Sequence, residues 1–174
     1  MNWKVSDLYL TVKQMEDHMN KEFEKLSIKL IRQFGKDRNM AMATVVNSVP
    51  TIRIVDTFFY DNCFYIVTHE SSEKVQQILS NKYVSLCTNF HEFQGEAFNI
   101  GHPLDDRNKE IREKLIDAFS NWYFAHNDES DPKMCILQVK INTAFTYFNK
   151  IGYNVDFKSQ EITKFPFNPK EKKV

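Results

Sequence analysis

The sequence contains 174 residues, of which 42% are hydrophobic, and its 23 Lys and Arg residues are balanced by 23 Asp and Glu residues. A chain of this length fits one domain with a sizeable core, and its zero net charge argues against binding to nucleic acid. No signal sequence opens the chain, and no apolar run approaches the roughly 20 residues that a membrane-spanning helix needs. We therefore expect a cytoplasmic protein without a membrane partner, in which any anion site is local.

The cysteines and histidines lack the short repeated spacing of a metal site. Cys63, Cys87 and Cys135 are widely separated and lie within apolar stretches. This pattern predicts three reduced thiols in the core. We expect no metal ion.

An amphipathic helical pattern occupies residues 6–34. Apolar residues from Leu8 to Phe34 recur every three or four positions, which places them along one helical face. Gly35 follows as a typical helix stop. The pattern predicts one helix or two, because the polar residues 17–20 are compatible with exposed helix or with a break.

Residues 40–68 contain three apolar, β-branched runs separated by the turn-forming sequences NSVP and DN. The runs have the length of strands, so they predict two consecutive antiparallel hairpins. Side chains alternate between the two faces of a strand. In the middle strand Arg53 therefore points away from the face that Ile52 and Ile54 share.

The remaining elements follow with short connections. In chain order they are a short helix at 71–80, a strand pair at 82–101 that meets near His91, an amphipathic helix at 108–124, and strands at 134–141 and 144–155. Strands and helices do not alternate regularly, so a closed antiparallel barrel is favoured over a parallel sheet.

The whole chain, residues 1–174, is predicted to form a single domain. It consists of a helical segment at about 6–34, a barrel at about 39–157 and a polar C-terminal tail that includes the sequence FPFNPKEKKV. The fold class is mainly β with flanking helices.

The junction between the third strand and the short helix has the composition of an anion site. The first turn of a helix exposes unpaired N–H groups and the positive end of its dipole, and Ser72 and Lys74 add a hydroxyl and a mobile charge. Arg53 on the neighbouring strand could hold the same phosphate through two parallel hydrogen bonds. The alternative is that Ser72 is an ordinary helix cap and Lys74 an ordinary solvated lysine.

Three motifs, in this order, resemble the pyridoxamine 5′-phosphate oxidase-like family of FMN-binding split barrels, most closely its general stress protein branch. They are P-x-x-R-I-V at 50–55, F-Y-I-V-T at 64–68 and S-x-K at 72–74. The resemblance extends through 81–101 and covers about 20–157 as a pattern. It implies an antiparallel split β-barrel of the FMN-binding type.

The resemblance also implies FMN as the cofactor and assigns its contacts. The phosphate would be held by Ser72 and Lys74, with Arg53 in the phosphate region. No metal takes part in this site.

The remaining contacts that the resemblance implies surround the flavin ring. The backbone of Ile54 and Val55 would meet the isoalloxazine edge, Thr68 would bond near the ring or ribityl chain, and Gln94 would touch the ring. Such proteins usually form homodimers with FMN at the subunit interface, so a homodimer is implied here.

The chain departs from the true oxidase at Phe58, where the oxidase has a lysine, and at Glu73, where it has an arginine. Glu73 would repel a phosphate if it pointed inward, so we expect it to face solvent. The oxidase's C-terminal Arg-x-His element is missing as well. We therefore do not expect oxidation of pyridoxine phosphate.

The leading hypothesis is an FMN-dependent oxidoreductase acting on an unidentified small organic substrate. The flavin would supply the redox chemistry, so no catalytic side chain is identified. One alternative is a non-catalytic FMN-binding carrier or stress-response protein. Another is a barrel that binds haem or the deazaflavin F420.

Overall fold

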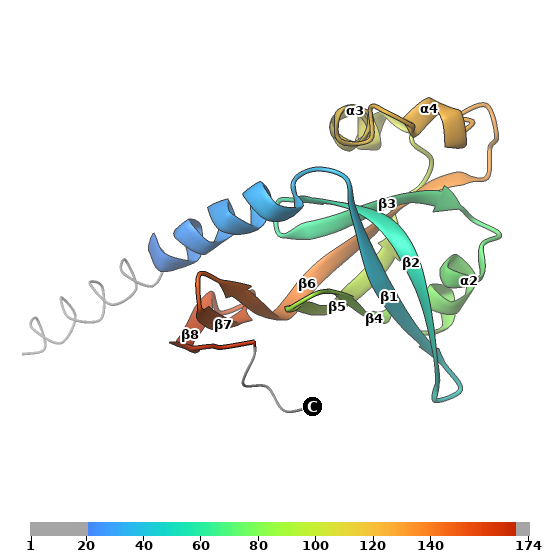
Figure 1. Cartoon of the computed structure of the whole chain (residues 1–174). Coiled ribbons are helices and arrows are strands. Elements are labelled where there is room, and N and C mark those ends of the chain that lie inside the picture. Colours follow the sequence, from blue (N-terminus) through green and yellow to red (C-terminus); the bar gives the residue numbers. More distant parts are fainter. Residues whose placement is uncertain (1–20, 170–174) are drawn as a thin grey trace, which may run out of the picture.

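The computed structural model describes residues 21–169, and its centre is an antiparallel sheet rolled into a barrel (Figure 1). The barrel strands are β1 (Arg38–Val46), β2 (Val49–Tyr60), β3 (Cys63–His69), β4 (Tyr83–Thr88), β5 (His91–Asn99) and β6 (Met134–Phe148). They are arranged in the order β3-β2-β1-β4-β5-β6, and pairing of β3 with β6 closes the barrel. The predicted antiparallel barrel is confirmed.

Two tight turns produce the predicted hairpins between β1, β2 and β3. Asn47 and Ser48 connect β1 to β2 with φ values of 51° and 63°, and Asp61 and Asn62 connect β2 to β3 with φ values of 48° and 56°. Asn and Asp tolerate positive φ better than most residues, and this backbone suits the twist of a two-residue hairpin. The turn residues therefore determine where these strands end.

Two further strands continue the sheet beyond the barrel. They are β7 (Ile151–Asp156) and β8 (Glu161–Pro166), each antiparallel to the strand before it. The structure differs here from the predicted polar tail, because Phe165 and Phe167 pack against Phe145 of β6 with ring centroids 6.1 Å and 5.2 Å away.

Two helical segments cover opposite ends of the barrel (Figure 1). Residues 21–34 are helical, and four of their apolar side chains are buried: Phe23, Leu26, Leu30 and Phe34. The rest of the helix predicted at 6–34 lies outside the described residues. At the other end, α2 (Glu73–Ser80) buries Val75 and Ile78.

The second predicted helix is interrupted. A 3₁₀ turn (Asp106–Asn108) leads into α3 (Lys109–Ala118), and α4 (Tyr123–His126) follows after a break. Ser120 and Asn121 lie in the break, and both residue types favour turns over helix interiors. Both helices pack outside the barrel in a second apolar cluster that includes residues of β2, β3 and β6.

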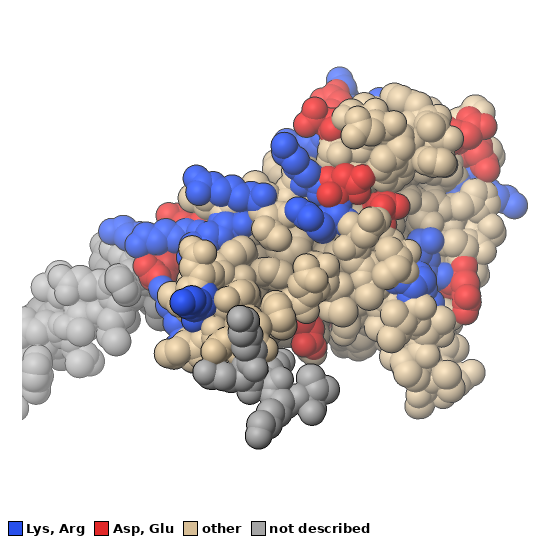
Figure 2. Space-filling view, in the orientation of Figure 1, with Lys and Arg blue, Asp and Glu red and all other residues tan. Residues whose placement is uncertain are grey.

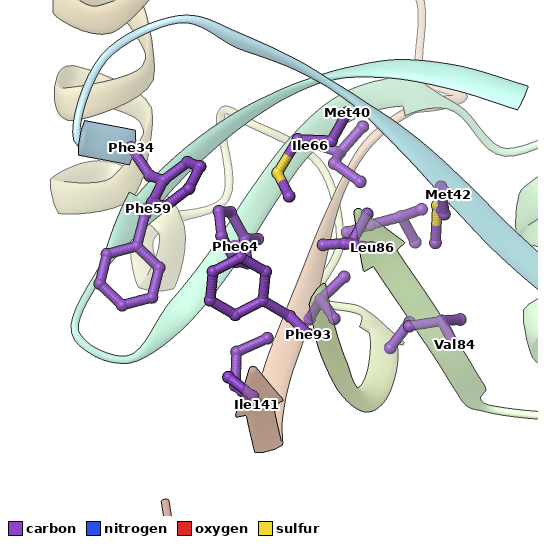
Figure 3. Packing of buried hydrophobic residues seen from close by; sticks show 14 of the residues in the cluster. Phe34, Met40, Met42, Phe59, Phe64, Ile66, Val84, Leu86, Phe93 and Ile141 are labelled. Atoms are coloured by element: carbon purple, nitrogen blue, oxygen red, sulfur yellow. The ribbon is translucent and has the colours of Figure 1, made fainter. Parts of the chain in front are cut away.

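Apolar side chains fill the barrel interior (Figure 3). Phe34 at the end of the N-terminal helix makes edge-to-face contacts with Phe64 and Phe93, at centroid distances of 5.8 Å and 5.4 Å. The prediction of three core cysteines is wrong in one case. Cys63 and Cys135 are buried, whereas Cys87 is exposed because its position on β4 points out of the barrel.

Candidate functional site

The barrel wall is split between β2 and β3. These strands pair only where Phe58–Tyr60 meets Cys63–Tyr65. Before this point β2 pairs with β1 alone, and after it β3 pairs with β6 alone, so the two strands diverge (Figure 1). In an antiparallel strand the backbone groups alternate between the two edges, so about half of those in the first part of β2 face the opening.

The N-terminus of α2 follows directly after the end of β3. Ser72 is the N-cap residue, but its hydroxyl accepts no capping hydrogen bond and lies 3.4 Å from Thr68 Oγ1. The carbonyl of Ser72 accepts from the N–H groups of Val75 and Gln76. The first helical N–H groups, those of Glu73 and Lys74, have no acceptor within the helix. Hydroxyl and backbone donors thus gather at this end of α2.

Arg53 points from β2 toward α2. Its strand neighbours Ile52 and Ile54 are 69% and 67% exposed, which confirms the predicted division of the two faces. The guanidinium donates from Nη1 to Thr44 Oγ1 at 2.5 Å and from Nη2 to Gln77 Oε1 at 2.7 Å. Both partners are neutral, so the positive charge of Arg53 is not cancelled by them.

Lys74 is the second cation of this region and is half-buried. Burial, and next the charge of Arg53, lower the pKa of Lys74 from its ordinary value. Within residues 21–169 neither cation is hydrogen-bonded or ion-paired to a carboxylate. A bound anion would relieve this repulsion and offset the loss of solvation.

Glu73, the acidic residue beside Lys74, is exposed as expected. Its Oε1 accepts a hydrogen bond of 2.6 Å from Gln77 Nε2. The carboxylate therefore lies on the solvent side of α2 and contacts Gln77 rather than either cation.

The structure does not bring Gln94 together with Arg53 and Lys74. Gln94 is exposed on β5 between the buried residues Phe93 and Gly95, so it points out of the barrel, whereas Arg53 shares the inner face of β2. A bulge between Gln94 and Gly95 shifts the pairing with β6. Within one chain, Gln94 and the two cations lie on opposite faces of the barrel wall.

The predicted residues thus fall into three sets. Arg53, Thr68, Ser72 and Lys74 belong to the region around the N-terminus of α2. The backbones of Ile54 and Val55 belong to the part of β2 that borders the split, and Gln94 is separate.

Sequence reasoning missed two residues of the site, Thr44 and Gln77. Thr44 is fully buried on the inner face of β1, in phase with Met40 and Met42. A polar residue at the end of an apolar stripe is a signal that could have indicated a buried partner for Arg53.

The outer face of the sheet is the other feature of interest. A hollow of about 280 Å³ is lined by Ala41, Ile52, Cys87 and Phe90, among others, and Val49 and Ile54 are exposed nearby on β2. The part of the surface over the tip of the β1–β2 hairpin carries no charged side chains in Figure 2. This face combines exposed apolar side chains with the position of Gln94.

No protein-family model matches the chain, and no curated protein matches its sequence. Solved structures do match. General stress protein 26 from Bacillus anthracis is 19% identical, with a TM-score of 0.55 over 69% of this chain and 92% of its own. The chain has the split-barrel fold of the pyridoxamine 5′-phosphate oxidase-like family.

Two further solved structures show a similar likeness. A pyridoxamine 5′-phosphate oxidase-related, FMN-binding protein from Nostoc punctiforme is 18% identical, with a TM-score of 0.50 over 76% of this chain and 87% of its own. A NimC/NimA family protein from Clostridium acetobutylicum is 20% identical, with a TM-score of 0.51 over 81% of this chain and 92% of its own.

Phe58 is a residue at which this chain departs from the true oxidase, which has a lysine there. Its ring is 7% exposed and belongs to the apolar cluster beneath α3 and α4. A lysine at this position would bury a charge in that cluster.

Among the described residues no three His, Cys, Asp or Glu side chains are grouped to hold a metal, and none of their helices is long and apolar enough to cross a membrane.

Proposed function

We propose that this split barrel is an FMN-dependent oxidoreductase acting on a small organic substrate. The observation that carries the proposal is the pair of cations, Arg53 beside α2 and Lys74 in its first turn, neither of which has a carboxylate partner among the described residues. Two half-buried positive charges are costly to hold close together, and groups with shifted pKa values tend to cluster at ligand-binding sites.

The phosphate of FMN fits the chemistry of this region. The N–H groups at the start of α2 and the hydroxyl of Ser72 supply neutral donors, while Lys74 supplies a charge. Arg53 uses two of its five N–H bonds for Thr44 and Gln77, so three remain for a ligand. All these donors converge from one helix end and one strand.

The rest of the flavin would extend along the split. The backbone of Ile54 and Val55 borders the opening and would offer donors and acceptors to the ring edge, and Thr68 Oγ1 lies 3.4 Å from the hydroxyl of Ser72. FMN, when bound, supplies hydride and electron transfer, and the chain would bind it, orient it and shape the substrate face.

A homodimer would bring Gln94 to the flavin. Gln94 faces outward in its own chain, so in this proposal it would contact a flavin held by the second copy. Ile52 and Ile54 expose apolar surface on the same outer side of the barrel, and burial between two copies would remove it from water. Each site would then be completed by the partner copy.

The substrate class is separate from that of the true oxidase. Phe58 fills the position of the oxidase lysine with a buried ring, and Glu73 replaces its arginine. Neither position carries a positive charge in this chain, so a second phosphate on the substrate would find fewer cations than in the oxidase. We therefore propose a substrate without a phosphate group.

The first test is the visible absorption spectrum of the purified protein before and after addition of FMN, with the released chromophore identified. An oxidised-flavin spectrum that bleaches with NADH or NADPH supports the oxidoreductase. A flavin spectrum without bleaching by any donor favours the second candidate, a flavin carrier. If no flavin is bound before or after addition, the cofactor and the enzyme proposal both fail.

A further inference from the structure

We infer that Gln77 is a positioning residue of the anion site, which fixes the guanidinium of Arg53 in the orientation that a phosphate needs. Gln77 Oε1 accepts from Arg53 Nη2 at 2.7 Å and also from the hydroxyl of Thr44. Thr44 in turn accepts from Arg53 Nη1 at 2.5 Å. The three side chains form a closed ring of hydrogen bonds, which holds the guanidinium at both of its terminal nitrogens.

The hydrogen bonds of the amide nitrogen, Nε2, determine the orientation of the Gln77 side chain. Its Nε2 donates to Glu73 Oε1 at 2.6 Å and, over 3.4 Å, to Thr51 Oγ1. A carboxylate accepts hydrogen bonds and an arginine only donates them, so reversing the amide would break the contacts on both sides. Glu73 therefore acts through Gln77: its carboxylate keeps the amide oxygen directed at Arg53.

This arrangement gives Glu73 a role other than repelling a bound phosphate. A long arginine side chain loses conformational freedom when it binds a ligand, and a side chain that is already fixed loses less. The hydrogen bond between Gln77 and Arg53 also connects α2 to β2. It therefore helps to hold the helix that carries Lys74 in place against the strand that carries Arg53. Gln77 itself would not touch the ligand.

The inference rests on the proposed function and adds to it a residue that acts only through Arg53. Removal of the amide in Gln77→Ala should affect ligands that carry a phosphate. Riboflavin has the ring and the ribityl chain of FMN without the phosphate, so it reports any general damage to the site. Gln76→Ala is the matched control, because the Gln76 amide lies on the same helix and donates to the carbonyl of Glu70 instead.

The experiment measures dissociation constants for FMN and riboflavin by quenching of flavin fluorescence, and for inorganic phosphate by calorimetry, in the wild type and both variants. We expect Gln77→Ala to weaken FMN and phosphate binding about three- to tenfold while the riboflavin constant stays unchanged. Gln76→Ala should match the wild type for all three ligands.

Unchanged FMN and phosphate constants in Gln77→Ala would overturn the inference, as would an equal loss for riboflavin, which indicates a structural role. A wild type that binds phosphate but no flavin would refute the proposed function alone, and the phosphate constants would then decide the role of Gln77. A wild type that binds neither would refute both.

Discussion

The positive charge of Arg53 on β2 acts on Lys74 of α2: burial, and next the charge of Arg53, lower the pKa of Lys74. Helix and strand come from different parts of the fold, and their meeting concentrates positive charge in a protein with no net charge. Within residues 21–169 neither cation pairs with a carboxylate, and the contribution of each to the proposed anion site can be tested separately.

Replacement of either cation should weaken FMN binding. Arg53→Ala and Lys74→Ala each remove a charge-assisted contact worth about 1.5–3 kcal/mol, which corresponds to roughly a 10- to 150-fold larger dissociation constant. Riboflavin binding should change far less. Fluorescence titration measures both, and Lys82→Ala serves as the control because Lys82 pairs with Glu96 elsewhere. Unaltered FMN affinity in both test variants would remove the phosphate site.

The outer face of β2 should form the interface between two copies. Ile52→Lys introduces a charge into an apolar contact that excludes water, so the variant should sediment as a monomer while the wild type sediments as a dimer. Its FMN affinity should also fall, because Gln94 of the second copy is lost. Ile28→Lys, at a residue 51% exposed on the N-terminal helix, is the matched control and should stay dimeric. A monomeric wild type would contradict the interface.

His91 should make the stability of the fold sensitive to acid. The side chain is 8% exposed with Nδ1 2.6 Å from Thr146 Oγ1, and burial, followed by the charge of Arg38, lowers the pKa of His91. The unfolded chain therefore binds the proton more tightly than the folded one. The stabilisation is complete above the unfolded pKa of about 6.5 and is lost as the pH falls below it.

Urea unfolding between pH 7.5 and about 5 measures this dependence on His91. The His91→Gln variant should be less stable at neutral pH and should show a flatter decline of its unfolding free energy toward acid. The exposed His126 provides the control, and His126→Gln should decline as the wild type does. Equal slopes for the wild type and His91→Gln would show that another group controls the acid sensitivity.

Gly95 should be intolerant of a side chain. A Cβ at this position would lie 2.2 Å from the carbonyl oxygen of Lys140 on the adjacent strand, and neither backbone can move without breaking the sheet. We expect Gly95→Ala to lower the free energy of unfolding by about 1–3 kcal/mol in urea titrations. At Gly152 the nearest obstacle is the ring of Phe165, a side chain that can move. Gly152→Ala should therefore lose less, and the reverse order would contradict the argument.

Local patterns predicted the features that depend on neighbours in the chain. The alternation of side chains along a strand placed Arg53 on the opposite face of β2 from Ile52 and Ile54. The turn residues correctly predicted where the first two strands end. Where local signals were weak, the prediction failed: the helix expected at 108–124 is broken after Ala118, and β8 occupies part of the expected tail.

By itself the sequence determined the β-rich class, the hairpins of β1 to β3 and the hydroxyl and lysine at the start of α2, because period and turn chemistry are properties of adjacent residues. Only the tertiary structure decided where β2 parts from β3, that Thr44 and Gln77 hold Arg53, and that Gln94 faces away from the two cations. These relationships join residues of different elements, and their geometry depends on how the barrel closes and where its ends are covered.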